Sequence, residues 1–170
     1  MNKNVVLNDV LKEFQKLAEI PRPSGHEKKV SDYIAGKLRN MGLNVVQDKY
    51  NNIIAEKKAA AGFENVPLIM MQGHMDMVCI ADPGVNYDPL NDPIKIKNDG
   101  IFLSAEGTSL GADDGMGIAN ILYLLSQDFD HGPLRIVFTV DEEQGMTGAR
   151  GLDKEYLKNV KYLINCDSED

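Results

Sequence analysis

Apolar residues follow two alternating patterns along this sequence, one with helical spacing and one of short continuous runs. Helical spacing occupies three segments, residues 8–18, 25–41 and 115–125. Continuous apolar runs occupy three others, residues 67–71, 134–140 and 162–165. Runs of this length between turn residues are typical of strands that are covered on both faces. The alternation of the two patterns predicts an α/β fold.

Cap and turn residues refine the bounds of these elements. Asn8 is the expected N-cap of the first helix, and Ser24 with Glu27 has the spacing of a capping box for the second. Two hairpins are predicted at residues 44–57 and 94–103, with turns at Asn51-Asn52 and Asn98-Asp99-Gly100. A short helical stretch is expected around residues 153–157.

Composition and charge indicate a single globular domain and argue against nucleic-acid and membrane partners. With 170 residues and 43% hydrophobic content, the chain is large enough for one domain with a core. A net charge of −8 argues against a nucleic-acid partner, because phosphate binding needs a basic surface. No apolar run approaches the roughly 18 residues of a membrane helix, and the N-terminus lacks a secretory signal. We therefore expect a cytoplasmic protein with no membrane partner, in which Cys79 and Cys166 are free thiols.

Each of the three apolar runs leads to side chains that bind metals. The first leads to His74 and Asp76, and residues two apart on a strand face the same way. Asp76 can therefore bind one imidazole nitrogen while a metal binds the other. The second run leads to Asp141-Glu142-Glu143, and the third to Cys166-Asp167. Carboxylates and imidazole gathered in this way need a cation among them.

A glycine-rich loop, residues 107–117, adds the paired aspartates Asp113 and Asp114 at the start of a helix. It is a poor phosphate-binding loop, because no lysine follows its glycines and the aspartates would repel phosphate. Either aspartate could bridge two metal ions, which together activate water and polarise a carbonyl. In Glu142-Glu143, neighbouring side chains point to different sides, so one can bind a metal while the other reaches the water.

Four motifs in this order resemble the co-catalytic zinc aminopeptidases and dipeptidases, with the aminoacyl-histidine dipeptidases as the nearest subgroup. They are Gly73-His74-Met75-Asp76, Gly111-Ala112-Asp113-Asp114-Gly115, Asp141-Glu142-Glu143-Gln144-Gly145 and Asn165-Cys166-Asp167. The stretch Pro21-Arg22-Pro23-Ser24-Gly25-His26-Glu27 is also similar to that subgroup. The resemblance implies a three-layer sandwich with a mixed, largely parallel sheet. It also implies hydrolysis of small peptides, dipeptides that end in histidine above all, by two divalent ions, zinc with cobalt or manganese as alternatives.

The resemblance also implies a role for each candidate residue. His74 and Asp167 bind one ion, Glu143 binds the other, Asp113 bridges them, Asp76 orients His74 and Glu142 is the general base. In this comparison Asp113 is preferred to Asp114 as the bridge, a choice that the residues alone leave open.

Members of that family continue beyond the last strand into a lid or dimerisation domain, and then complete the catalytic domain with a further metal-binding histidine. We therefore expect residues 1–170 to be the N-terminal part of the catalytic domain, truncated and inactive by itself. Its sheet would keep an unpaired edge that favours homo-oligomers. The alternatives are an aminoacylase or tripeptidase with the same metal cluster, or a non-catalytic interaction module whose acids only collect cations.

Overall fold

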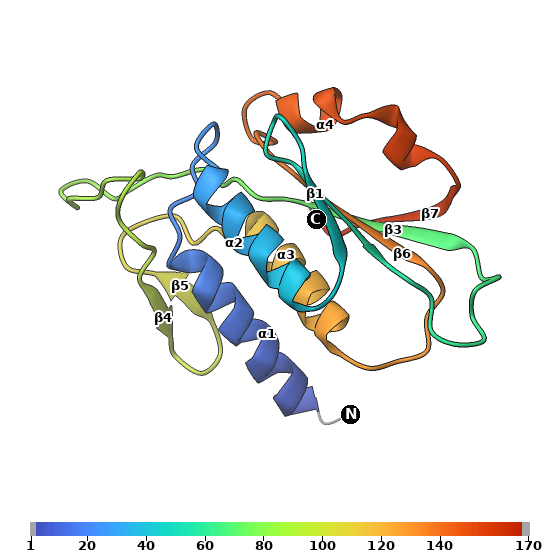
Figure 1. Cartoon of the computed structure of the whole chain (residues 1–170). Helices are drawn as coiled ribbons and strands as arrows, with labels where there is room; N and C mark the ends of the chain where they lie inside the picture. The colour runs from blue at the N-terminus through green and yellow to red at the C-terminus, as the bar shows by residue number, and fades with distance from the viewer. Residues whose placement is uncertain (1–2, 168–170) are drawn as a thin grey trace.

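The computed structural model describes residues 3–167 and has an α/β architecture (Figure 1). Its helices are α1 (Lys3–Ala18), α2 (Lys28–Asn40), α3 (Ala112–Ser126), α4 (Thr147–Gly151) and the 3-10 turn η1 (Lys154–Leu157). Its strands are β1 (Asn44–Gln47), β2 (Ile53–Lys57), β3 (Leu68–His74), β4 (Ile96–Asn98), β5 (Leu103–Ala105), β6 (Leu134–Thr139) and β7 (Val160–Asn165). Met1 and Asn2, part of the N-terminal stretch that predicts no secretory signal, lie outside the described residues, as do residues 168–170.

Five strands form the main sheet in the order β1-β2-β6-β3-β7. Strand β2 is antiparallel to both of its neighbours, whereas β3 is parallel to β6 and to β7. The other four strands therefore run in one direction, and the predicted mixed, largely parallel sheet is confirmed. The carboxyl ends of β3, β6 and β7 meet at one edge, which is where ligands bind in sheets of this kind.

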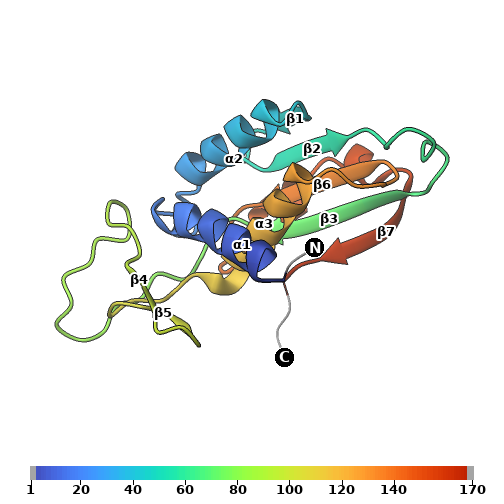
Figure 2. The same ribbon diagram turned by 90° about the horizontal axis from the view of Figure 1, so that it is seen from below.

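Helices cover the two faces of this sheet unequally. On one face α1, α2 and α3 pack side by side, as Figure 2 shows. Ile136 and Phe138 of β6 point into the core beneath these helices. Val137, between them in sequence, points to the opposite face and packs near Leu152 and Tyr156, in the segment that carries α4 and η1. This alternation along one strand confirms the expected three layers.

The helix starts differ from the predictions. α1 begins at Lys3, so Asn8 lies inside the helix and is not its N-cap. α2 begins after Glu27 without a side-chain cap, so the predicted capping box is wrong. Ser24 donates its hydroxyl to Asp76 instead, and Glu27 accepts the backbone N–H groups of Gly25 and Asp141. Two partners distant in sequence, Asp76 and Asp141, and the nearby Gly25 thus replace the bonds that the capping box predicts.

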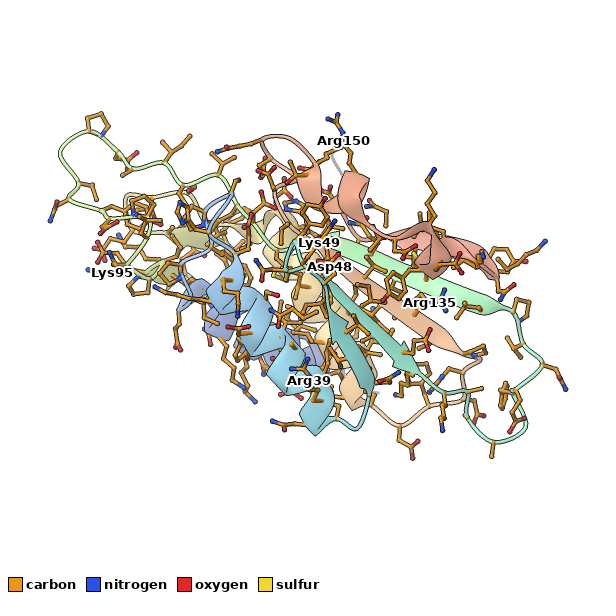
Figure 3. All side chains as sticks on the ribbon, turned by 45° about the horizontal axis from the view of Figure 1, so that its top comes forward. Arg39, Asp48, Lys49, Lys95, Arg135 and Arg150 are labelled. Atoms are coloured by element: carbon orange, nitrogen blue, oxygen red, sulfur yellow. The ribbon has the colours of Figure 1, made fainter. Side chains whose placement is uncertain are left out.

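Both predicted hairpins are present. The first has a longer turn than expected, in which the Asp48 carboxylate (labelled in Figure 3) accepts the N–H groups of Tyr50 and Asn52. The second hairpin, β4–β5, forms a separate two-stranded sheet about two residues later than predicted. Helix α4 was not predicted, because five residues that include two glycines carry no periodic signal.

Strand β7 forms one edge of the main sheet and leaves apolar side chains in solvent. Tyr162, Leu163 and Ile164 are 56%, 60% and 48% exposed. Both cysteines are free, as predicted. Among residues 3–167, no helix has the length and apolar character needed to cross a membrane.

The exposed apolar edge strand β7 should make the chain self-associate. Leu163→Lys should weaken that association, because a charged edge residue opposes strand pairing. Sedimentation velocity over a range of concentrations measures the effect. The matched control is Val46→Lys on β1, the opposite edge strand, where the side chain is 41% exposed. A wild-type chain that stays monomeric, or equal effects of the two variants, would contradict the expectation.

Candidate metal centre

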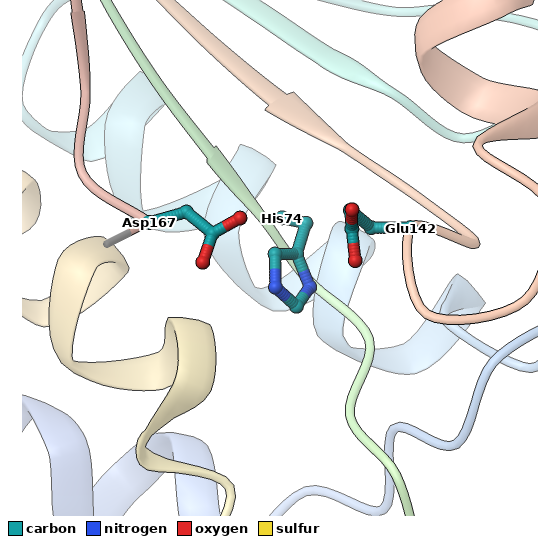
Figure 4. Close-up of side chains that lie close together, drawn as sticks. All are labelled: His74, Glu142 and Asp167. Carbon is teal, nitrogen blue, oxygen red and sulfur yellow. The ribbon is translucent and has the colours of Figure 1, made fainter. Parts of the chain in front are cut away.

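Three neighbouring strands bring the candidate ligands together. His74 is the last residue of β3 and is in register with Thr139 at the end of β6, so the turn containing Glu142 follows beside it. On the other side Gln72 of β3 is in register with Asn165, the last residue of β7. Figure 4 shows His74, Glu142 and Asp167 converging from these three strand ends.

Two groups of side chains place their ligand atoms within 4.8 Å of one another, and His74 belongs to both. One group contains His74, Glu142 and Asp167; the other contains His74, Asp113 and Glu143. All four predicted metal ligands are thus brought into the two groups. Glu142, the predicted base, lies among them. Asp113 and Asp167, predicted to share an ion, fall in different groups.

The imidazole of His74 lies between two carboxylates. Its Nε2 is 2.9 Å from Oδ1 of Asp113, and its Nδ1 is 3.3 Å from Oδ1 of Asp76. Burial lowers the pKa of His74, but the two neighbouring carboxylates outweigh burial and raise this pKa to about 9. Nε2, the nitrogen on the Asp113 side of the ring, is therefore the one that would bind a cation. Asp76 lies on the opposite side, next to Nδ1.

Asp76 is completely buried and connects three segments. Its carboxylate accepts the Ser24 hydroxyl at 2.7 Å and the backbone N–H groups of Glu142 and Glu143 at 3.0 and 3.2 Å. Burial alone would raise the pKa of Asp76, yet the neighbouring His74 and the hydrogen bonds from Glu142, Ser24 and Glu143 lower it to about 2. Asp76 is thus ionised at neutral pH, and it holds the backbone of the neighbouring acids beside the imidazole.

The two adjacent aspartates before α3 face different surroundings. The Asp113 side chain is 54% exposed and contacts His74 Nε2. Asp114 is 2% exposed, and its Oδ2 accepts the backbone N–H of His74 at 3.1 Å. A methyl group at Gly73 or Gly117 would collide with the Asp114 carboxylate, so glycine is needed at both positions. This geometry favours Asp113 over Asp114 as the residue available to a metal.

The acids around His74 raise one another's pKa. Burial raises the pKa of Glu142, His74 opposes this rise and Asp167 adds to it. Burial and then Asp113 raise the pKa of Glu143. Carboxylates crowded in this way repel each other, and a divalent cation relieves that repulsion. One imidazole with several carboxylates is also a donor set suited to zinc, so the residues present fit the metal ions implied by the sequence.

The sequence profile of peptidase family M20/M25/M40 matches residues 70–170. The chain belongs to this family. Among curated relatives, the cytosol non-specific dipeptidase of Escherichia coli strain K12 is 41% identical over 158 residues, which are 92% of this chain and 32% of the relative. The chain therefore spans about a third of that relative's length.

Solved structures of the M20 peptidases share the fold. The aminoacylhistidine dipeptidase from Vibrio alginolyticus superimposes with a TM-score of 0.90 at 39% identity, over 95% of this chain and 33% of that one. A Bacillus subtilis protein described as a dinuclear metal binding peptidase from the M20 family superimposes with a TM-score of 0.58 at 21% identity, over 96% of this chain and 43% of that one. This second likeness shows the fold alone.

Sequence reasoning missed three residues that support the metal centre, all in the loop between α1 and α2. Arg22 is buried and donates to the carbonyl oxygens of Met75 and Asp76. Ser24 and Glu27 bond to the segments after β3 and β6, as described above. The similarity of residues 21–27 to the dipeptidase subgroup marked this loop, but nothing in the sequence indicated the partners of its side chains.

The ion pairs of His74 give a test by pH titration of the metal-free chain. By NMR the imidazole should titrate at about 9, and Asp76→Asn should lower this pKa because it removes an acceptor that favours the imidazolium. A folded-state pKa above the unfolded value means that these ion pairs stabilise the fold below pH about 6.5, and that this stability is lost as the pH rises toward about 9. An unchanged His74 pKa in the Asp76 variant would contradict this geometry.

Proposed function

We propose that this chain is the metal-binding part of an M20 dipeptidase that hydrolyses aminoacyl-histidine dipeptides. The observation that carries the proposal is the convergence of one imidazole and four carboxylates at the carboxyl edge of the sheet. They form two groups in which the ligand atoms lie within 4.8 Å of one another. The similarity to the Escherichia coli and Vibrio alginolyticus dipeptidases supports the choice of substrate. A small peptide is the partner, and the net charge of −8 argues against nucleic acid.

The proposed ligands divide between two ions. His74 and Asp167 would hold one ion, Glu143 would hold the other, and Asp113 would be shared between them. Zinc is the proposed metal, with cobalt or manganese as alternatives. The contact between Asp113 and His74 Nε2 supports this role for Asp113, because the two groups are close enough to bind the same ion.

When bound, the two ions would make a water molecule more acidic and polarise the scissile carbonyl. Glu142 would accept a proton from the attacking water and return it to the leaving amine. Burial raises the pKa of Glu142, which is the direction expected for a general base. The Glu142 N–H bond to Asp76 positions the start of this side chain beside His74.

We further propose that residues 1–170 are the N-terminal part of a catalytic domain whose remaining part, with a lid or dimerisation domain, lies outside this chain. The relatives' greater length and the exposed apolar edge of β7 support this arrangement. The chain alone should then be inactive and the complete protein active. Its free cysteines and the cytosolic relative favour the cytoplasm.

Two substitutions in the complete protein separate the base from the ligands. Glu142→Gln should lower kcat by about 10² to 10⁴ and leave metal content unchanged, because an amide keeps the shape but cannot accept a proton. Glu143→Gln should lose metal as well as activity, because it removes a negative ligand. Each variant is the control for the other, and metal analysis with steady-state kinetics measures both. The reverse pattern would mean that the two roles are exchanged.

The same assay distinguishes the alternatives. An aminoacyl-histidine dipeptide is compared with a tripeptide and with an N-acyl amino acid. Preference for the tripeptide or the N-acyl substrate would assign a tripeptidase or an aminoacylase. Tight metal binding by the complete protein without any hydrolysis would assign a non-catalytic module.

A further inference from the structure

Arg22 is a buried cation beside the metal centre that the proposed chemistry does not use. It lies in the loop between α1 and α2, and its side chain is 1% exposed. Nη1 donates to the carbonyl oxygens of Met75 at 3.0 Å and Asp76 at 2.9 Å. Nη2 donates to the carbonyl oxygen of Gly111. One planar group thus joins the segment after β3 to the loop before α3.

Backbone bonds fix Arg22 itself against the first of these segments. Its carbonyl oxygen accepts the N–H of Met77 at 3.1 Å, and Pro23 forms a parallel β-bridge with Met77. Arg22 therefore moves with the chain that follows His74. Through Nη2 it fixes the position of the other segment, two residues before Asp113.

Glycines provide the space that the guanidinium occupies. A Cβ atom at Gly111 would lie 2.7 Å from Nη2 of Arg22 and 2.5 Å from Sδ of Met77. One at Gly115 would lie 2.6 Å from the same Nη2 and 2.9 Å from Cε2 of Phe14. Real Cβ atoms do not approach other atoms so closely, so a side chain at either position would crowd the guanidinium together with Met77 or Phe14. The loop that carries Asp113 is therefore shaped around Arg22 on both sides of the aspartate.

The charge of Arg22 is compensated by groups of the metal centre. Burial lowers the pKa of Arg22 to about 10, while Cys79, Asp76 and Asp114 oppose that fall. The side chain is therefore protonated at neutral pH. A lysine could supply the same charge, but it lacks the planar fork that reaches carbonyl groups in two directions.

We propose that Arg22 is a positioning residue, whose guanidinium sets the distance between the segment carrying His74 and the loop carrying Asp113. His74 and Asp113 come from different elements, and their ligand atoms must stay within one coordination sphere. A small shift of either segment would separate them. This inference rests on the proposed function, because the distance matters only if both residues bind metal.

The test compares Arg22→Lys with Arg135→Lys in this chain. Arg135, labelled in Figure 3, is a matched control because it also donates to two backbone carbonyls, those of Tyr156 at 2.7 Å and Lys158 at 3.1 Å. It lies at the start of β6, the end of the strand away from the metal centre. Zinc affinity is measured by calorimetry, coordination by the visible spectrum of the cobalt-loaded chain, and folding by circular dichroism.

Arg22→Lys should weaken zinc binding roughly 10- to 100-fold, the usual effect of losing a residue that orients ligands, and should change the cobalt spectrum. Arg135→Lys should leave affinity and spectrum unchanged. Wild-type affinity and spectrum in Arg22→Lys, or equal losses in both variants, would overturn the inference. A wild-type chain that binds no zinc would overturn the proposed function and this inference with it.

A second variant covers the case in which Arg22→Lys does not fold. Gly115→Ala keeps the arginine but places a methyl group against Nη2 and against the Phe14 ring. It should weaken zinc binding in the same direction. A folded Gly115→Ala chain with wild-type zinc affinity would overturn the inference.

Discussion

The buried carboxylate of Asp76 is the constraint on which the metal centre depends. It accepts three hydrogen bonds, from Ser24 and from the N–H groups of Glu142 and Glu143, and it lies behind the imidazole of His74. These partners belong to three separate segments of the chain. An ionised carboxylate without such partners would be costly to bury, so the segments are stable only when they meet around it. The proposed base Glu142 and two of the proposed ligands, His74 and Glu143, are therefore positioned by the same anion.

Other buried polar groups extend this arrangement. Glu27 accepts the N–H of Asp141, Asp114 accepts the N–H of His74, and Arg22 donates to the carbonyls on either side of the centre. Leaving one such buried group without a partner typically costs about 1–3 kcal/mol, so each bond opposes movement of the segment it joins. The ligand geometry is thus built before any metal binds, which is the condition for precise catalytic sites.

The sequence predicted the parts of this structure that depend on short-range pattern and on topology. Apolar runs identified β3, β6 and β7, and the parallel connection of these strands places His74, Glu142 and Asp167 at one edge. It could not predict the roles of Ser24 and Glu27, because the same local spacing serves a capping box or a tertiary contact equally well. Nor could it separate Asp113 from Asp114. That difference arises from Gly73 and Gly117, which leave room for only the second carboxylate inside the protein.

The most direct test of this account is anomalous diffraction from crystals of the chain soaked in zinc. The account predicts an ion about 2.0–2.1 Å from Nε2 of His74, bound also by the carboxylate of Asp113 or Asp167, with Asp76 remaining behind the ring. An ion bound to other acids, with His74 Nε2 still paired only to Asp113, would contradict the assignment of this edge of the sheet as the metal centre.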